Sequence, residues 1–136
     1  MKILGLHKDP WHNSGASIIV ENDGDVTFSN LAEERADRKK DSREFPNESI
    51  KILMKDAGIE SFEEFDYVVM DYITNNTDWK KDFFKNSCST DNFLQNIQEE
   101  KIIMVNHHLC HAYNVFYSSK FDRAAILIVD GRGSDN

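Results

Sequence analysis

The turn Asn22-Asp23-Gly24-Asp25 constrains the fold more than any other feature of this sequence. An Asp-Gly pair between two runs rich in β-branched residues is a strong signal for a tight β-hairpin. The flanking runs 16–21 and 26–32 are therefore predicted to be antiparallel strands, and the apolar run 2–6 a strand that precedes them. The chain should begin as an antiparallel three-stranded meander.

The remainder alternates strands with helices. The clearest helix is predicted over 46–58, where apolar residues recur at helical spacing, Asn47 can cap the start and Gly58 can end the last turn. The other predicted elements are strands over 67–73, 101–105 and 124–129, helices over 79–85 and 91–99, and a helix that begins at His107. We therefore expect an α/β fold in which one mixed sheet with flanking helices forms a single domain, residues 1–136.

Composition excludes several classes of partner. The formal net charge of −8 argues against nonspecific binding to nucleic acid or to an anionic membrane surface. No apolar run approaches the length of a membrane helix, the first residues lead directly into a strand, and the two cysteines form no metal motif or disulfide framework. We expect a cytoplasmic protein whose partners are small molecules.

Three histidines, at positions 107, 108 and 111, lie at the start of a predicted helix. Residues four apart share one face of a helix, so His107 and His111 can bind one metal ion, and His108 could take the place of His107. Asp130, at the end of the strand 124–129, can supply a third ligand. Two histidines and a carboxylate suit iron, zinc or manganese. The alternative is a polar helix N-terminus that binds no metal.

Two further segments admit a binding role and a plain structural one. Gly131 and Gly133 allow a ligand close to the backbone, and Arg132 between them suits phosphate or carboxylate. The same residues are also typical of an ordinary hairpin turn. The charged run 33–43 is either a solvated or mobile surface loop or a source of cations, Arg38, Lys39 or Lys40, for an anionic substrate.

Motifs spread over nearly the whole chain occur together in one known family. They are Ile3-Leu4-Gly5, His12-Asn13-Ser14-Gly15-Ala16-Ser17, Glu33-Glu34-Arg35, Arg38-Lys39-Lys40, Phe45-Pro46, Ala57-Gly58-Ile59, His107-His108-Leu109-Cys110-His111-Ala112, Phe116-Tyr117-Ser118-Ser119 and Asp130-Gly131-Arg132-Gly133. In this order they resemble the O-carbamoyltransferases, which include nodulation and antibiotic-tailoring enzymes. The last two of these motifs together are quite specific, although any one alone would not be.

The resemblance implies the first lobe of an actin-like ATPase (ribonuclease H-like) fold, followed by the opening strand, about 124–130, of a second lobe. It implies transfer of a carbamoyl group from carbamoyl phosphate to a hydroxyl, through a carbamoyl-adenylate formed with ATP. A divalent metal, iron before zinc or manganese, would be held by three residues here and by a fourth ligand in the second lobe. The implied site residues are His107, His111 and Asp130 for the metal, His12 and Lys40 for catalysis, and Gly131, Arg132 and Gly133 for phosphate.

Four positions depart from the family pattern, all on the substrate side of the implied site. They are Asn13, Asp37, Asp41 and Ser134, where the family commonly has Asp, Ser or Thr, His and an acidic residue. The charge of Asp41 would weaken an anion site near Lys40. We expect the chain alone to be inactive in carbamoyl transfer. The alternatives are a non-catalytic module that forms a homodimer through exposed apolar surface, and a metal-dependent hydrolase that uses only the two histidines and Asp130.

Overall fold

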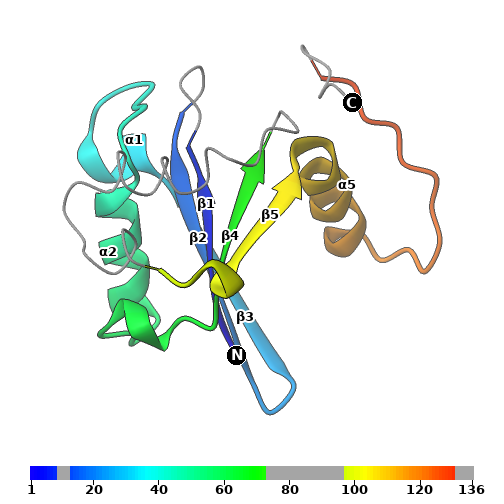
Figure 1. The fold of residues 1–136 in the computed structure, drawn as a ribbon. Coiled ribbons are helices and arrows are strands. Elements are labelled where there is room, and N and C mark those ends of the chain that lie inside the picture. The colour runs from blue at the N-terminus through cyan, green and yellow to red at the C-terminus, as the bar shows by residue number, and fades with distance from the viewer. Residues whose placement is uncertain (9–12, 73–96, 131–136) are drawn as a thin grey trace.

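A computed structural model of the chain describes residues 1–8, 13–72 and 97–130, which form an α/β fold (Figure 1). A five-stranded mixed sheet has the order β3-β2-β1-β4-β5. Its strands are β1 (Lys2–His7), β2 (Gly15–Asn22), β3 (Asp25–Ala32), β4 (Tyr67–Tyr72) and β5 (Ile102–Asn106). The helices are α1 (Glu33–Asp37), α2 (Asn47–Asp56) and α5 (His107–Ser118), with short 3-10 turns η1 (Phe62–Glu64) and η2 (Glu99–Lys101). None of the helices in these ranges is long and apolar enough to cross a membrane.

The predicted antiparallel meander is confirmed. β1 pairs antiparallel with β2, and β2 with β3, with Asn22 opposite Asp25 at the hairpin end. The two central residues, Asp23 and Gly24, have φ of 52° and 90°, as a two-residue hairpin turn requires. β4 lies parallel to β1 and β5 parallel to β4, so the carboxyl ends of these three strands meet at one edge of the sheet.

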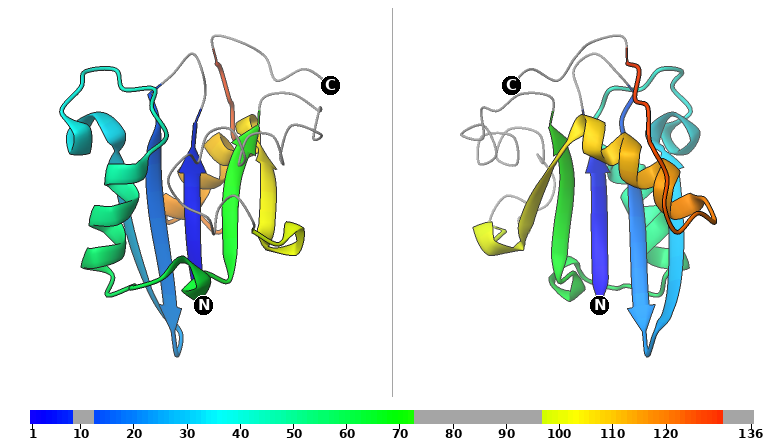
Figure 2. Two further views of the ribbon diagram at one scale, coloured as in Figure 1. Left: turned by 60° about the vertical axis from the view of Figure 1, so that its left-hand side comes forward. Right: turned by 90° about the vertical axis from the view of Figure 1, so that its right-hand side faces the viewer.

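The two faces of the sheet differ in chemistry. Helices α2 and α5 lie on opposite sides of it (Figures 1 and 2). Side chains on the α2 face form the core; the buried apolar residues of the sheet are Leu4, Leu6, Ala16, Ile18, Val68 and Met70. Because side chains alternate along a strand, the residues between them point to the α5 face. That face carries the polar and small residues described below.

The predicted apolar stripe of α2 is confirmed. Ile50, Leu53 and Met54 are at most 8% exposed, and Ala57 packs against the same cluster. The helix ends as predicted at Gly58, whose φ is 65°. The amide of Gly58 donates to the Lys55 carbonyl (3.2 Å) and that of Ile59 to the Met54 carbonyl (2.8 Å), which is the Schellman pattern that favours glycine at this position.

The predicted cap at the start of α2 is wrong. Asn47 is the first residue of the helix, and Pro46 at the capping position makes no side-chain cap. The Glu33 carboxylate takes this role instead, because its two oxygens accept hydrogen bonds from the amides of Glu48 (3.1 Å) and Ser49 (2.9 Å). A distant buried carboxylate therefore satisfies amides that a helix leaves without intrahelical partners.

The charged run 33–43 forms ordered structure. Helix α1 is followed by a turn in which Arg38 and Asp41 have positive φ, 63° and 56°. The Asp37 carboxylate accepts hydrogen bonds from the Lys39 amide (2.8 Å) and the Ser42 hydroxyl (2.6 Å). The solvated alternative is confirmed for most of this run, although Glu33 is buried; the exposed residues are Arg35, Arg38, Lys39, Lys40, Asp41 and Arg43.

Other predicted elements have different outcomes. Residues 124–130 form no strand, because no described strand lies beside them to pair with their amides and carbonyls. They run past α5 without joining the sheet (Figure 1). The helix predicted over 79–85 lies outside the described residues, as does 91–96 of the helix predicted over 91–99. Residues 97–98 are not helical and lead into η2.

Candidate metal centre

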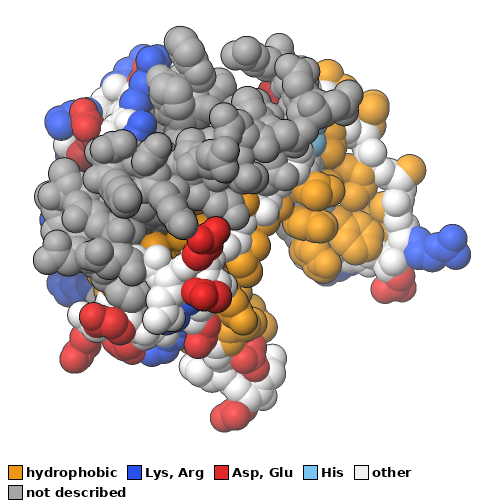
Figure 3. Space-filling model, in the orientation of Figure 1, with side chains coloured by type: hydrophobic (Ala, Val, Ile, Leu, Met, Phe, Trp, Pro, Cys, Tyr) orange, Lys and Arg blue, Asp and Glu red, His pale blue; other side chains and the backbone are white. Residues whose placement is uncertain are grey.

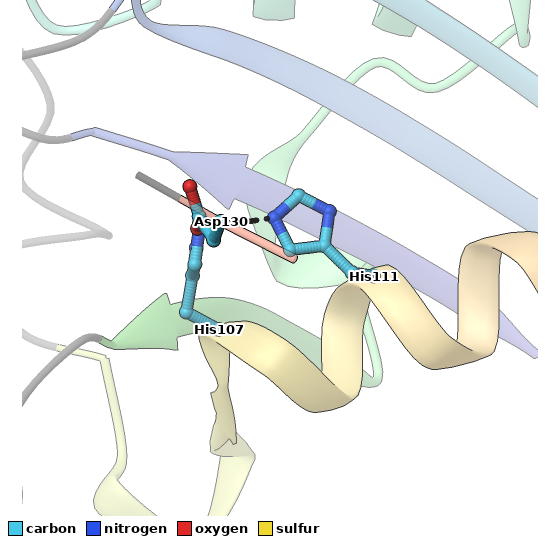
Figure 4. Close-up of side chains that lie close together, drawn as sticks. All are labelled: His107, His111 and Asp130. Atoms are coloured by element: carbon cyan, nitrogen blue, oxygen red, sulfur yellow. Dashed lines mark hydrogen bonds and ion pairs between the residues drawn. The ribbon is translucent and has the colours of Figure 1, made fainter. Parts of the chain in front are cut away.

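The end of β5 and the start of α5 position the histidines. The Asn106 side chain caps the helix by accepting hydrogen bonds from the amides of His108 (2.9 Å) and Leu109 (3.4 Å). The helix therefore begins at His107, directly after the strand. His107 and His111 lie one turn apart, and their side chains converge with that of Asp130 (Figure 4).

The three predicted metal ligands form one cluster. Nε2 of His107 lies 3.0 Å from Oδ2 of Asp130 and 3.1 Å from Nε2 of His111, and Nε2 of His111 lies 3.6 Å from the same carboxylate oxygen. Ligand atoms bound about 2.1 Å from one ion lie about 3 to 3.5 Å apart. The cluster therefore has the dimensions of a single-ion site.

The sequence left His107 and His108 as alternatives. The structure places His108 farther away, with its Nε2 4.0 Å from Oδ2 of Asp130. His107 has the more central position, since it contacts both other members of the cluster through Nε2.

Asp71, near the end of β4, joins the site although the sequence analysis did not predict it. Its Oδ2 lies 2.8 Å from Nδ1 of His107, and its Oδ1 lies 2.9 Å from Nδ1 of His7 at the end of β1. Strand register explains the proximity: Leu6 pairs with Met70, and Asp71 pairs with Val105, two residues before His107. In the sequence, Asp71 could have been noticed as the one charged residue of an otherwise uncharged strand, Tyr67–Tyr72.

These contacts leave more lone pairs than protons at the centre of the cluster. A neutral His107 that donates from Nδ1 to Asp71 has only a lone pair at Nε2. That lone pair lies 3.0 Å from the Asp130 carboxylate, which can also only accept hydrogen bonds. The arrangement therefore calls for a positive charge at Nε2, either a second proton on His107 or a metal ion. Two imidazoles and a carboxylate are suitable donors for iron, zinc or manganese.

Burial and hydrogen bonding act in opposite directions on nearby titratable groups. Burial raises the pKa of Asp71, but hydrogen bonds and charges from His7 and His107 outweigh it, so the pKa lies below its usual value. Burial and the charge of Asp71 raise the pKa of Cys110 to about 11. Cys110 is therefore a thiol rather than a thiolate, and it is only partly buried.

A cavity of about 600 Å³ adjoins the cluster on the α5 face of the sheet. His107 and His111 line it together with residues of β1, β2, β3 and β4. Two rows of paired residues cross the sheet here: Val69, Gly5, Ser17 and Asn30 form one, and His7, Gly15 and Ala32 form the other. Asp71 also lines the cavity and contacts the His7 ring at the end of the second row. The lining therefore combines small side chains with hydrogen-bonding groups, as a polar ligand would require.

The charged segment after β3 supports the rim of this cavity. Ser14, which lines the cavity, donates from its hydroxyl to the Glu44 carbonyl (2.5 Å) and from its amide to the Ser42 carbonyl (2.9 Å). Asn13 donates to the Glu34 carboxylate (3.3 Å), which also accepts from the Asp41 amide (3.0 Å). The turn that carries Lys40 is thus tied to the cavity wall.

The remaining predicted site residues are not brought to the cluster by described structure. His12, Gly131, Arg132 and Gly133 lie outside the described residues. Lys40 lies exposed in the turn after α1 and is not among the residues that line the cavity.

Comparison with known proteins gives three distant relatives. The chain is 27% identical to an uncharacterized protein of Synechocystis sp. over 96% of its length, and 27% identical to an uncharacterized protein of Methanocaldococcus jannaschii over 90%. It is also 27% identical to nodulation protein NolNO of Sinorhizobium fredii over 89% of its length. The matches cover 25%, 21% and 20% of those proteins, so the chain spans a quarter of their length or less. No family model matches the chain.

The match to a nodulation protein agrees with the resemblance to nodulation carbamoyltransferases found in the sequence motifs. At 27% identity it supports a relationship to a carbamoyltransferase-related family and no finer assignment.

Proposed function

We propose that this chain forms the metal-binding part of a carbamoyltransferase. Such an enzyme would move a carbamoyl group from carbamoyl phosphate, through a carbamoyl-adenylate made with ATP, to a hydroxyl acceptor. The observation that carries the proposal is the convergence of His107, His111 and Asp130 beside a cavity with polar lining. The similarity to nodulation protein NolNO supports the choice of reaction class.

In this proposal the three side chains hold a divalent ion, for which iron is the first choice and zinc or manganese the alternatives. When bound, the ion supplies a Lewis acid that can polarise a substrate oxygen. His107 and His111 present Nε2 to it from one helix face, and Asp130 brings a negative charge from a separate segment. Asp71 holds the opposite nitrogen of His107 and fixes the orientation of that ring.

The substrate side of the proposal rests on residues implied by the family resemblance. His12 and Lys40 are assigned to catalysis, and Gly131, Arg132 and Gly133 to phosphate binding. In the transfer step the acceptor oxygen bonds to the carbamoyl carbon, the bond from that carbon to the adenylate oxygen breaks, and AMP leaves. The hydroxyl proton passes to a base, a role that we assign to His12, while the charge of Lys40 would stabilise the departing phosphate.

The activity belongs to a longer protein in this proposal, since the chain spans only 20–25% of its relatives. The described residues would form the first lobe of an actin-like fold. Residues 124–130, which form no strand in the described structure, would become the opening strand of a second lobe. The chain alone should therefore give no more than a trace of carbamoylated product, and substantial turnover by it would contradict this division of the site.

Metal content tests the proposal directly. We expect the purified chain, loaded anaerobically with Fe²⁺ and desalted, to retain one equivalent of metal. His107→Ala and His111→Ala should retain none, because each removes a ligand from a three-residue site. His108→Ala is the matched control, since its ring lies 4.0 Å from Asp130, and it should retain the metal. A folded wild-type chain without metal, or retention in both ligand variants, would contradict the proposal.

We also propose a homodimer as the second candidate role of this chain, with an identical copy as the partner. The observation that favours it is the apolar surface gathered over α5 and the segment after it (Figure 3). Tyr117, Leu127 and Val129 are 78%, 88% and 84% exposed. Because burial of such surface drives association, sedimentation equilibrium should show a dimer that Leu127→Asp weakens. A wild-type chain that stays monomeric at all concentrations would exclude this role.

A further inference from the structure

We propose that Asp71 is the positioning residue of this site: its one carboxylate orients two imidazoles, that of His107 at the metal cluster and that of His7 in the cavity wall. The inference rests on the proposed metal site and assigns a role to two residues that the family motifs do not include. It is drawn from the geometry of three sequence-distant elements, β1, β4 and the start of α5.

The contacts are matched in kind. Each carboxylate oxygen of Asp71 forms a hydrogen bond with Nδ1 of one imidazole ring, at 2.9 Å for His7 and 2.8 Å for His107. A carboxylate only accepts hydrogen bonds, so Nδ1 must carry a proton in both rings. Strong charge-assisted hydrogen bonds of this length hold the rings in fixed orientations.

Fixing the proton on Nδ1 determines which atom of His107 can bind a metal. Nε2 is then left for coordination, and it is the atom that faces Asp130 and His111. Without Asp71 the ring could place its proton on Nε2 or rotate, and either change would remove a ligand. A carboxylate behind a ligating histidine is the common way in which proteins prevent both.

Burial makes Asp71 suited to this task. Its side chain is 14% exposed and that of His107 17%, whereas that of His111 is 50% exposed. A carboxylate in this environment needs its partners, because an unpaired buried charge is costly. The Asp71–His107 contact should therefore persist when the more exposed side of the cluster moves.

The second ring extends the effect to the cavity. His7 lines the cavity beside Gly5, and its orientation is set by the same carboxylate that sets the metal ligand. A ligand that displaces the His7 ring must therefore disturb the hydrogen bond at Asp71. The structure thus couples the cavity wall to the metal cluster through one residue.

The test compares Asp71→Asn with wild type in two measurements on the full chain. The first is ring-nitrogen NMR of the metal-free protein, which reports whether Nδ1 carries a proton. The second is the affinity for Zn²⁺ by competition with a chelator. Asp66→Asn is the matched control: it removes the same charge just before β4, where the carboxylate accepts the Lys2 amide (2.7 Å) far from the cluster.

We expect Nδ1 of both His7 and His107 to be protonated in wild type and in Asp66→Asn, and at least one of the two rings to lose its Nδ1 proton in Asp71→Asn, whose side chain keeps a single acceptor oxygen. Zinc affinity should fall about 10- to 100-fold in Asp71→Asn and stay unchanged in Asp66→Asn. An unprotonated Nδ1 on His107 in the wild-type chain would overturn the proposal, even if Asp71→Asn fails to fold. Unchanged zinc affinity in a folded Asp71→Asn chain would overturn it as well.

The two proposals fail in different ways. If the wild-type chain shows both Nδ1 protons, loses at least one of them in Asp71→Asn and binds no zinc, then Asp71 orients the rings and the proposed metal function is wrong. If zinc binds and needs His107 and His111 but is indifferent to Asp71, then the metal function stands and the positioning role is wrong.

Discussion

Replacing Glu33 by alanine should destabilise the fold by about 3 kcal/mol. Glu33 is 2% exposed, and its carboxylate accepts two amide hydrogen bonds at the start of α2, from Glu48 at 3.1 Å and Ser49 at 2.9 Å. Its own amide donates to the Ser14 carbonyl (3.0 Å) in the cavity wall. Glu33 therefore connects the helix behind the sheet with the edge of the candidate site.

The magnitude follows from these contacts. Hydrogen bonds to a charged group contribute about 1.5 to 3 kcal/mol each, and a carboxylate near a helix N-terminus about 0.5 to 2 kcal/mol. The sum overstates the loss, because burial of the carboxylate carries a desolvation cost that alanine removes. A net loss of about 3 kcal/mol remains. Glu33→Gln keeps one acceptor but places an amide donor against a backbone donor, so it should cost about 1 to 2 kcal/mol.

Urea unfolding followed by circular dichroism measures these values. The control is Glu48→Gln, an exposed residue of the same helical turn paired with Lys51, which should change stability by less than about 0.5 kcal/mol. The reasoning would be refuted if Glu33→Ala and Glu48→Gln had equal effects. It would also be refuted if Glu33→Gln were as stable as wild type.

Three further predictions concern other contacts of the fold. The hydrogen bond from Lys2 lowers the pKa of Glu64 from 4.5 to about 2. The stabilisation that this contact gives the folded state is therefore present above pH 4.5 and lost as pH falls through about 2. Acid should lower the urea midpoint of wild type more than that of Glu64→Gln. A Cβ on Gly5 would collide with the Ser17 hydroxyl, so Gly5→Ala should lower the free energy of unfolding by about 1 to 3 kcal/mol. The double variant with Ser17→Ala should recover most of this loss, which thermal unfolding would measure. Among the described residues the buried Ser49 hydroxyl has no hydrogen-bond partner, so Ser49→Ala should keep or raise the unfolding free energy, by up to about 1 kcal/mol.

Local patterns predicted much of this molecule. The hairpin turn and the apolar runs around it gave the meander, and the spacing of Ile50, Leu53 and Met54 gave the buried face of α2. Helical spacing also brought His107 and His111 to one face, where the structure adds Asp130. In these cases the relevant neighbours are set by a period of two or 3.6 residues, so the sequence is sufficient.

The rest depends on contacts between distant segments. Glu33 caps a helix that begins fourteen residues later, and nothing in its charged surroundings distinguishes it from its exposed neighbours. Asp71 meets His7 and His107 only because β1, β4 and β5 pair in parallel in one particular register. The strand predicted over 124–129 does not form for a related reason: its apolar sequence suits a strand, but no described strand lies beside it to pair with it.

The alternation of the sheet explains how the core and the candidate site share the same strands. In β1, Leu4 and Leu6 point into the core beneath α2, while the alternate residues Gly5 and His7 face the cavity. In β4, Val68 and Met70 are buried in the same core, while Val69 and Asp71 face the cavity. A one-residue slip of β4 against β1 would exchange these faces, bury Asp71 against apolar side chains and separate it from His7 and His107. The packing that stabilises the fold therefore also sets the register that assembles the site.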